Sequence, residues 1–244
     1  MPDMGRMPRA VPMPQVGRMP QAGWMPEVGR MPDGGPVLLP AAGRVRTAWR
    51  NGGGTTAEVI VRGDSRNPGA ETGFDWRVSI ATVECDGDFS PYPGVDRWLM
   101  PLSAGGLRLV EEGELVPVGL HEVRAFPGER AVSAVGVTEP TLDLNLMVRR
   151  GETTGALCAA EVAGRAELAT AAGEQLVILV LSGVIDAALD TAPEGTPPGA
   201  RSSRTLARHD AVFLGAGRQL TLHGVGRIAV ARIATVPGDD PVPA

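Results

Sequence analysis

The stretch Thr141-Leu142-Asp143-Leu144-Asn145-Leu146-Met147-Val148-Arg149 has the clearest structural pattern in the chain. Its leucines and its valine recur at every second position, and the residues between them are mostly polar or ionic. Successive side chains of a β-strand point to opposite faces, so the pattern predicts a strand with one apolar and one mixed polar face. We expect the apolar face to pack on a partner sheet, while the polar face either meets solvent or lines the mouth of a cavity.

Short apolar stretches bounded by Gly, Pro, Asp and Asn lie on both sides of this strand. With 33 glycines, 22 prolines and no long amphipathic pattern, the chain is typical of an all-β sandwich or barrel. Further strands are predicted at Thr56–Val61, Trp76–Val83, Gly106–Glu111, Glu122–Phe126, Val132–Val137, Gln175–Ser182, Ala211–Leu214, Gln219–His223 and Arg227–Thr235.

An internal similarity indicates that these strands form two related lobes. Leu120-His121-Glu122 and Arg208-His209-Asp210 each precede, at the same spacing, an arginine that leads into an apolar stretch. We therefore expect an N-terminal lobe over residues 37–151 and a C-terminal lobe over residues 152–240. The Pro- and Gly-rich segment 190–204 is predicted to be a surface loop of the second lobe.

Residues 1–36 have a different character. Met-Pro pairs recur at a fixed interval through this segment, with glycines between them. Frequent prolines exclude a helix and the glycines weaken a strand, so we expect the segment to be disordered. A docking tail with methionines as soft contacts is the alternative, and it would make the chain an interaction module.

Composition narrows the functional classes. A net charge of -5 argues against nucleic acid, and the longest aliphatic run, Leu176–Leu181, is too short to span a membrane. With no apolar segment typical of a signal peptide, the chain is expected to be cytoplasmic, with Cys85 and Cys158 as buried reduced thiols. The three histidines have no metal-ligand spacing and no GxSxG elbow is present, so neither a metal nor another cofactor is expected.

Three places could bind a ligand. The glycines of Asn51-Gly52-Gly53-Gly54 suit either a flexible hairpin or a ligand-facing loop. Arg97, at the end of a Pro-rich loop, is either an anion contact or the partner of Asp96 in a turn. An arginine beside an asparagine and an aspartate, as in 143–149, would seat a small carboxylate well.

Five motifs in order resemble the HutD/Ves family of bacterial proteins across nearly all of the chain after residue 36. They are Trp49–Thr55, Phe74–Ala81 with Glu84, Phe89–Arg97, Phe126–Gly128 and Asp143–Gly151. Two positions depart from the usual pattern: Arg50 stands where lysine is common, and Leu144 where phenylalanine is common. The resemblance implies a bicupin of two cupin-like lobes without metal-binding histidines, and a regulatory role in histidine utilisation.

The resemblance also implies a small acidic metabolite such as N-formylglutamate or urocanate as ligand in the N-terminal lobe. We expect it to be bound without catalysis, which is all that a sensor needs. The alternative is a metal-independent enzyme with Glu84 or Asp143 as general base, which requires a desolvated carboxylate. The sequence leaves a homodimer open. The expected ligand-binding residues are Asn51, Ser79, Arg97, Asn145 and Arg149.

Overall fold

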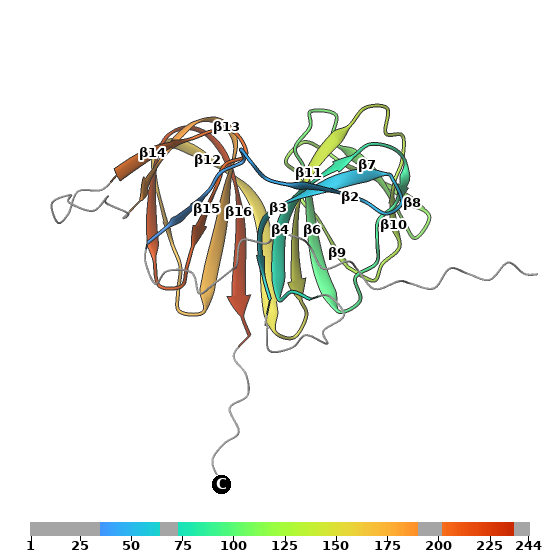
Figure 1. The fold of residues 1–244 in the computed structure, drawn as a ribbon, viewed down its shortest axis with the longest axis horizontal. Coiled ribbons are helices and arrows are strands. Elements are labelled where there is room, and N and C mark those ends of the chain that lie inside the picture. The colour runs from blue at the N-terminus through green and yellow to red at the C-terminus, as the bar shows by residue number, and fades with distance from the viewer. Residues whose placement is uncertain (1–34, 64–72, 190–201, 237–244) are drawn as a thin grey trace, which may run out of the picture. The chain divides into compact units, whose positions relative to one another are not determined.

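The computed structural model describes residues 35–63, 73–189 and 202–236, and across these ranges all regular structure is β (Figure 1). The all-β prediction is therefore confirmed. The described residues contain no helix that could cross a membrane. The predicted tail and the predicted loop after Leu189 lie largely outside the described residues.

The strands form three sheets, whose orders are as follows. The first sheet is β2 (Arg46–Ala48), β3 (Gly54–Arg62), β4 (Trp76–Val83), β11 (Thr141–Arg149), β6 (Val95–Pro101) and β9 (Arg124–Pro127). The second is β5 (Gly87–Asp88), β10 (Val132–Ala134), β7 (Leu107–Glu111) and β8 (Glu114–Val118). The third is β1 (Val37–Leu39), β15 (Ala211–Leu214), β13 (Glu174–Leu189), β16 (Gln219–Thr235) and β12 (Thr153–Ala169), with β14 (Ser202–Leu206) also beside β13.

The first two sheets face each other and form what we call the N-terminal sandwich. Val83, Leu99 and Phe126 of the first sheet share one apolar core with Leu109 and Val132 of the second. Directly paired residues of neighbouring strands point to the same side of a sheet. The face of the first sheet that carries these three apolar residues is therefore the one that meets the second sheet.

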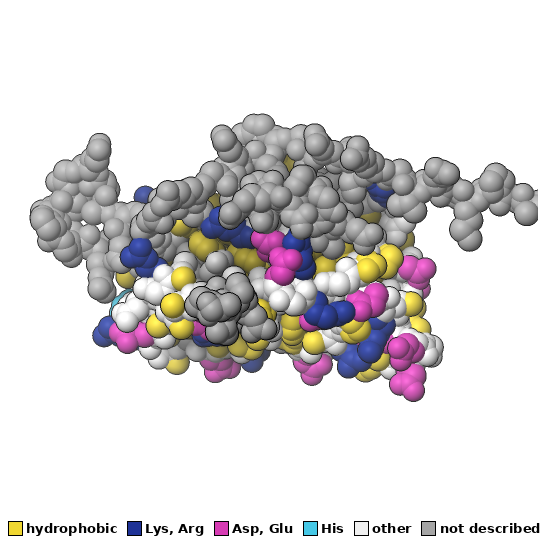
Figure 2. All heavy atoms as spheres, turned by 90° about the horizontal axis from the view of Figure 1, so that it is seen from below, with side chains coloured by type: hydrophobic (Ala, Val, Ile, Leu, Met, Phe, Trp, Pro, Cys, Tyr) yellow, Lys and Arg dark blue, Asp and Glu magenta, His cyan; other side chains and the backbone are white. Residues whose placement is uncertain are grey.

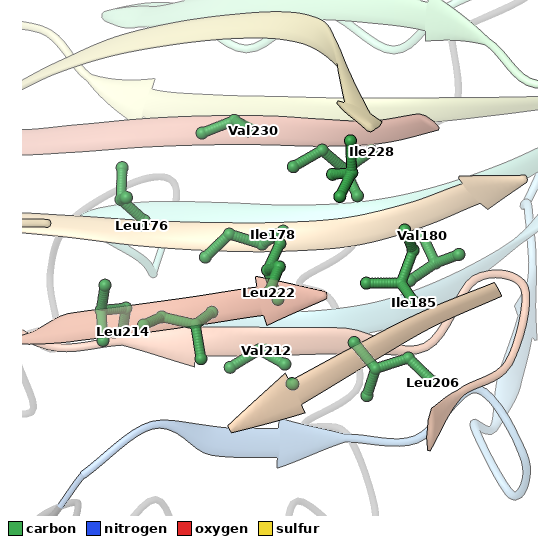
Figure 3. Close-up of a cluster of buried hydrophobic side chains, with 13 residues drawn as sticks. Leu176, Ile178, Val180, Ile185, Leu206, Val212, Leu214, Leu222, Ile228 and Val230 are labelled. Atoms are coloured by element: carbon green, nitrogen blue, oxygen red, sulfur yellow. The ribbon is translucent and has the colours of Figure 1, made fainter. Parts of the chain in front are cut away.

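The third sheet, here called the C-terminal sheet, folds over its own core (Figure 3). Ile178 and Ile185 lie on opposite sides of Gly183 in β13, and Leu222 and Ile228 lie on opposite sides of Gly224 and Gly226 in β16, yet all four apolar residues belong to one buried cluster. The strands turn at glycines: a Cβ on Gly226 would lie 2.3 Å from the carbonyl oxygen of Ser182. Such close backbone approach admits only glycine at the bend.

The opposite face of the first sheet, which carries Trp76 and Trp98, packs against the C-terminal sheet. Trp76 of β4 stacks on Phe213 of β15 with ring centroids 6.2 Å apart. A Cβ on Gly155 of β12 would meet the ring of Trp98 at 2.9 Å, so these strands approach closely. β4 and β11 are consequently buried on both faces, as central strands between two layers are.

The N-terminal strand β1 crosses to the C-terminal sheet, where Val37 pairs with Phe213 (blue in Figure 1). Sequence order alone assigns residue 37 to the first lobe, but its hydrogen bonds belong to the second. The chain then returns through β2, at the edge of the first sheet. Without β1, β15 would be an edge strand, and an edge strand can pair with any segment of suitable pattern. The local sequence around residue 37 therefore does not predict this pairing.

Two further findings concern the surface. The expectation of buried thiols is wrong, because Cys85, after β4, and Cys158, on β12, are both exposed and unpaired. The face drawn in Figure 2 intersperses acidic and basic side chains. The ion pairs among the described residues include those of Arg150 with Asp96 (2.7 Å) and Glu129 (2.8 Å).

Candidate functional site

A row of polar side chains lies inside the N-terminal sandwich. Asn145 of β11 is paired with Ser79 of β4 on one side and with Leu99 of β6 on the other. Since Leu99 belongs to the core between the two sheets, Asn145 and Ser79 point into the sandwich as well. Both are almost completely buried, with 5% and 2% of their surface exposed. Of the two expectations for the polar face, exposure to solvent is therefore wrong here.

Asp143, two residues earlier on the same face, is 1% exposed. The amide Nδ2 of Asn145 donates a hydrogen bond to Oδ2 of Asp143, whereas Oδ1 of Asp143 has no partner among the described residues. Burial raises the pKa of Asp143 to about 7, and both the hydrogen bond from Asn145 and the charge of Arg97 act in the opposite direction. The carboxyl is thus poised to gain or lose a proton near neutral pH.

Arg97 of β6 supplies a buried cation to the same face. Its guanidinium lies over the rings of Phe126 (5.0 Å), Phe89 (5.6 Å) and Tyr92 (5.6 Å), and its Nη1 donates to the carbonyl of Ser90 at 3.3 Å. Burial lowers the pKa of Arg97 to about 10, so the group stays charged at neutral pH. Its Nε has no hydrogen-bond partner in the described ranges. Aromatic faces stabilise a cation but satisfy none of its N–H donors.

The unpartnered polar atoms of this row are its main chemical feature. Within the part of the chain that the structure describes, Arg97 Nε, Asp143 Oδ1 and Asn145 Oδ1 are all buried without a hydrogen bond, as is Nε of the neighbouring Arg77. Buried polar groups without partners are costly, and natural proteins keep few of them without a reason. A bound molecule with one carboxylate and further polar groups would satisfy a donor and acceptor set of this kind.

Charged groups from the rest of the sandwich are already paired. Glu111 of β7 is 4% exposed and accepts two hydrogen bonds from Arg124 of β9 (both 2.8 Å) and one from Arg130 (3.1 Å). The bonds from Arg124 hold the pKa of Glu111 below its usual range. Arg77 forms an ion pair with Glu58 at 3.2 Å. Among the described residues of this face, Arg97 and Asp143 are the charged side chains that are almost completely buried and lack a full set of partners.

Asn51 is placed differently from the other expected site residues. It is exposed, its Oδ1 accepts a hydrogen bond from the backbone N–H of Gly53 (3.1 Å), and its Nδ2 lies 3.4 Å from the carbonyl of Asp88. The surrounding segment is the turn between β2 and β3, with Trp49 N donating to Gly54 O at 2.8 Å. Of the two interpretations of the triglycine segment, the hairpin describes its observed structure.

Arg149 ends β11 on the same face as Asn145, but its guanidinium is engaged with other groups. It pairs with Asp75 (3.4 Å) and Glu152 (3.2 Å) and donates to the carbonyl of Phe74 (2.9 Å). These contacts tie the start of β4 and the turn after β11 together. The structure thus brings Ser79, Arg97 and Asn145 together around Asp143, and places Asn51 and Arg149 away from them.

The two candidate general bases also differ. Glu84 is exposed and therefore lacks the desolvation that such a base needs, whereas Asp143 has it. Within the described ranges, no group of three or more His, Cys, Asp or Glu side chains could hold a metal ion.

Several contributors to the site were missed from the sequence. Arg77 alternates with Ser79 in one predicted strand, so a period of two could have found it. The aromatic side chains around Arg97 come from a loop and from β9, which are distant in sequence, and no local signal joins them.

The fold defines the class of protein: the chain is a cupin-like all-β protein. Among solved structures with this fold, a mutant of oxalate decarboxylase OxdC from Bacillus subtilis aligns at a TM-score of 0.53 and 9% identity, covering 82% of this chain and 76% of that one. The HutD family model matches residues 41–231, and the chain therefore belongs to the HutD family.

Relatives of known sequence and structure agree with this assignment. An uncharacterized 21.2 kDa protein in the hutC 3' region of Pseudomonas putida is 37% identical over 112 residues, covering 45% of this chain and 56% of that protein. Protein Ves of Citrobacter koseri is 35% identical over 104 residues, covering 42% and 52%. The matches thus span about half the length of these relatives. The structure of HutD from Pseudomonas fluorescens SBW25 (formate condition) aligns at a TM-score of 0.66 and 23% identity, over 83% of this chain and all of that one.

Proposed function

We propose that the N-terminal sandwich binds a small carboxylate metabolite and that the protein acts without catalysis as a regulator of histidine utilisation. Membership of the HutD family and the relative beside hutC support a role connected with histidine utilisation. The observation that carries the ligand proposal is the cluster of buried, unpartnered polar atoms on Arg97, Asp143 and Asn145. N-formylglutamate and urocanate are the candidate ligands.

Arg97 is the group that selects for an acid. Its guanidinium is fixed in place by three aromatic rings, so binding loses little side-chain entropy. The carboxylate of the ligand accepts from Nε, while Asn145 and Ser79 orient the remainder of the molecule. Asp143 is protonated in the bound state, because an ionised carboxylate there would compete for Arg97 and repel the ligand.

The test is calorimetric titration of the full chain with each acid, combined with thermal melts. A saturating acid raises the melting temperature, since a ligand that binds only the folded state stabilises it by mass action. Arg97→Gln should weaken binding at least about tenfold, the usual scale for one charged hydrogen bond. Arg108→Gln, on an exposed position of β7 in the same sandwich, is the matched control and should bind as the parent does.

Loss of fold in Arg97→Gln would be visible in its melt. Ser79→Ala is therefore a second variant, which removes only a hydroxyl from the buried row. The proposal is contradicted if neither acid raises the melting temperature at millimolar concentration.

A metal-independent reaction is the second candidate function, and one observation favours it. Asp143 has a pKa of about 7, the range in which a general base works best at neutral pH. Product analysis after long incubation with each acid separates the two. Turnover that disappears in Asp143→Asn would support the enzyme, and binding without turnover supports the regulator.

A further inference from the structure

Two equivalent turns carry the histidines His121 and His209. Both residues adopt a left-handed backbone, with φ of 62° and 69°. The N–H of His121 donates to the carbonyl of Pro101 (3.0 Å), and that of His209 to the carbonyl of Val180 (2.8 Å). In each turn the following acid, Glu122 or Asp210, accepts from a backbone N–H three residues earlier at 2.8 Å. The internal similarity of the sequence thus corresponds to one turn built twice.

These two turns meet where the N-terminal sandwich contacts the C-terminal sheet. Arg208, the neighbour of His209, donates through Nη2 to the carbonyl of Leu102 (3.3 Å), next to the residue that accepts from His121. Asp210 accepts from the N–H of Ala41 (2.6 Å), which brings the segment before Arg44 to the same place. A short stretch of surface thereby receives side chains from four separate parts of the fold.

Arginine side chains gather around the two imidazoles. Arg227 is paired with Ser182 across the sheet, close to the strand that accepts from His209. Arg44 and Arg208 complete the cluster, because both lie near enough for their charges to act on His209. We call this cluster the histidine–arginine seam: Arg44, His121, Arg208, His209 and Arg227. Nδ1 of His121 and Nε2 of His209 are buried and have no hydrogen-bond partner among the described residues.

The acids that face the seam offset only part of this charge: burial lowers the pKa of Arg44, and the charge of Asp210 acts in the opposite direction. Asp210 divides its two oxygens between the N–H groups of Ala41 and Ala207, and Glu122 is used by Gly119. Glu161 lies 3.9 Å from Arg227 and both are exposed, so solvent screens the pair. Burial first, and then the nearby arginines, lower the pKa of both histidines, that of His209 to about 4.

We propose that the histidine–arginine seam is a second anion-binding site, which takes a small oxyanion. Arginines hold such groups with several parallel hydrogen bonds, and the two imidazoles add positive charge to the site once they carry protons. The bound anion offsets the mutual repulsion of the cations. Binding therefore raises the affinity of both imidazoles for protons. The affinity for an oxyanion whose own charge stays constant rises as pH falls from about 6.5 toward 4.

The experiment is a titration of the full chain with inorganic phosphate, followed by NMR of the histidine ring protons. The chain has only three histidines, and the third, His223, is an internal control on an exposed position of β16. Saturable shifts of His121 and His209, with raised pKa values and an unchanged His223, are expected. A parallel titration with succinate shows whether the site takes phosphates, carboxylates or both, and saturation by either one supports an oxyanion site.

Variants test the arginines independently of the carboxylate proposal for the sandwich. Arg208→Gln should raise the dissociation constant at least about tenfold, and Arg165→Gln, on an exposed part of β12, should leave it unchanged. Arg97→Gln should keep the phosphate response, so failure of one site is distinguishable from failure of the other. The proposal is overturned by the absence of saturation with both anions, by an equal response to sodium chloride, or by full binding in Arg208→Gln.

Discussion

The side-chain amide of Asn145 donates a hydrogen bond to the carboxyl group of Asp143, two residues away on the same buried face of β11. This contact favours the ionised form of the carboxyl group, whereas burial raises its pKa to about 7. The protonation state of Asp143 therefore depends on the contacts inside the N-terminal sandwich.

Stability should fall as pH rises toward 7 because of Asp143. Its pKa is about 7 in the folded protein and about 3.9 in an unfolded chain, so the folded state holds the proton more tightly. This contribution is complete below the unfolded pKa and is lost as pH rises through the folded one. Relative to Asp143→Asn, the parent should lose no more than about 4 kcal/mol of unfolding free energy between pH 4 and 8. Urea unfolding of both proteins at several pH values measures it, and parallel curves would contradict the assignment.

Binding of the proposed acid should weaken as pH rises above 7. Binding requires protonated Asp143, so the dissociation constant of N-formylglutamate should rise by up to about tenfold per pH unit there. The carboxylates of this probe stay ionised throughout that range, which leaves the protein as the titrating partner. Asp143→Asn should bind equally well at pH 6 and pH 8. Calorimetry in buffers of different ionisation enthalpy would detect the proton uptake, and its absence would remove Asp143 from the site.

Glu111→Gln should destabilise the sandwich by about 2 kcal/mol, below the usual cost of breaking a fully buried pair because Arg124 and Arg130 are partly exposed. The charge of Glu111 stabilises the fold above its unfolded pKa and this contribution is lost at low pH, so the effect should shrink below about pH 4. Glu114→Gln, on an exposed position of β8, is the control. Equal stability of both variants at pH 7 would mean that the buried pair contributes nothing.

Gly54→Ala should cost more than about 2 kcal/mol, because its Cβ would lie 2.1 Å from the carbonyl oxygen of Thr82 on the neighbouring strand. Gly53→Ala is a sharp comparison, since the nearest atom there is Asn51 Oδ1 at 3.4 Å, and it should cost less than about 1 kcal/mol. Thermal melts of the two variants decide the matter. A tolerated alanine at position 54 would show that close strand packing is not what requires this glycine.

Removing residues 1–36 should leave the melting temperature unchanged, whereas removing residues 1–40 should lower it. The longer deletion takes away β1, which pairs with β15, and Leu38, which packs against the core of the C-terminal sheet. Lost strand pairing exposes the edge of β15 and part of that core. Melts of both truncated proteins test this, and a large loss with the shorter deletion would mean that the Met-Pro segment contributes to the fold.

Much of the strand pattern followed from alternation along the chain. Trp76–Val83, Thr141–Arg149 and Ala211–Leu214 have the predicted bounds, because regular apolar positions and clear turn residues define them. β16 was predicted as two strands, since Gly224 and Gly226 read as a turn where the strand only bends. β12 was missed altogether, because its alanines and glycines carry little apolar signal and its pairing with β16 defines it.

The candidate site was predictable in its members but not in its surroundings. Ser79, Arg97 and Asn145 could be selected as polar residues of predicted or loop-adjacent strands. Asn145 points into the sandwich because the second sheet covers that face of β11. The position of the second sheet cannot be predicted from the sequence of β11 alone. The same limit explains Asn51 and Arg149, whose hydrogen-bond partners lie on distant segments.

The pairing of Val37 with Phe213 has a consequence for the order of assembly. During synthesis β1 leaves the ribosome long before β15 exists, so β1 waits unpaired until β15 has emerged. The C-terminal sheet therefore closes only after β15 has been made. A circular permutant that moves residues 37–40 to follow Val236 would make these two strands near neighbours in synthesis.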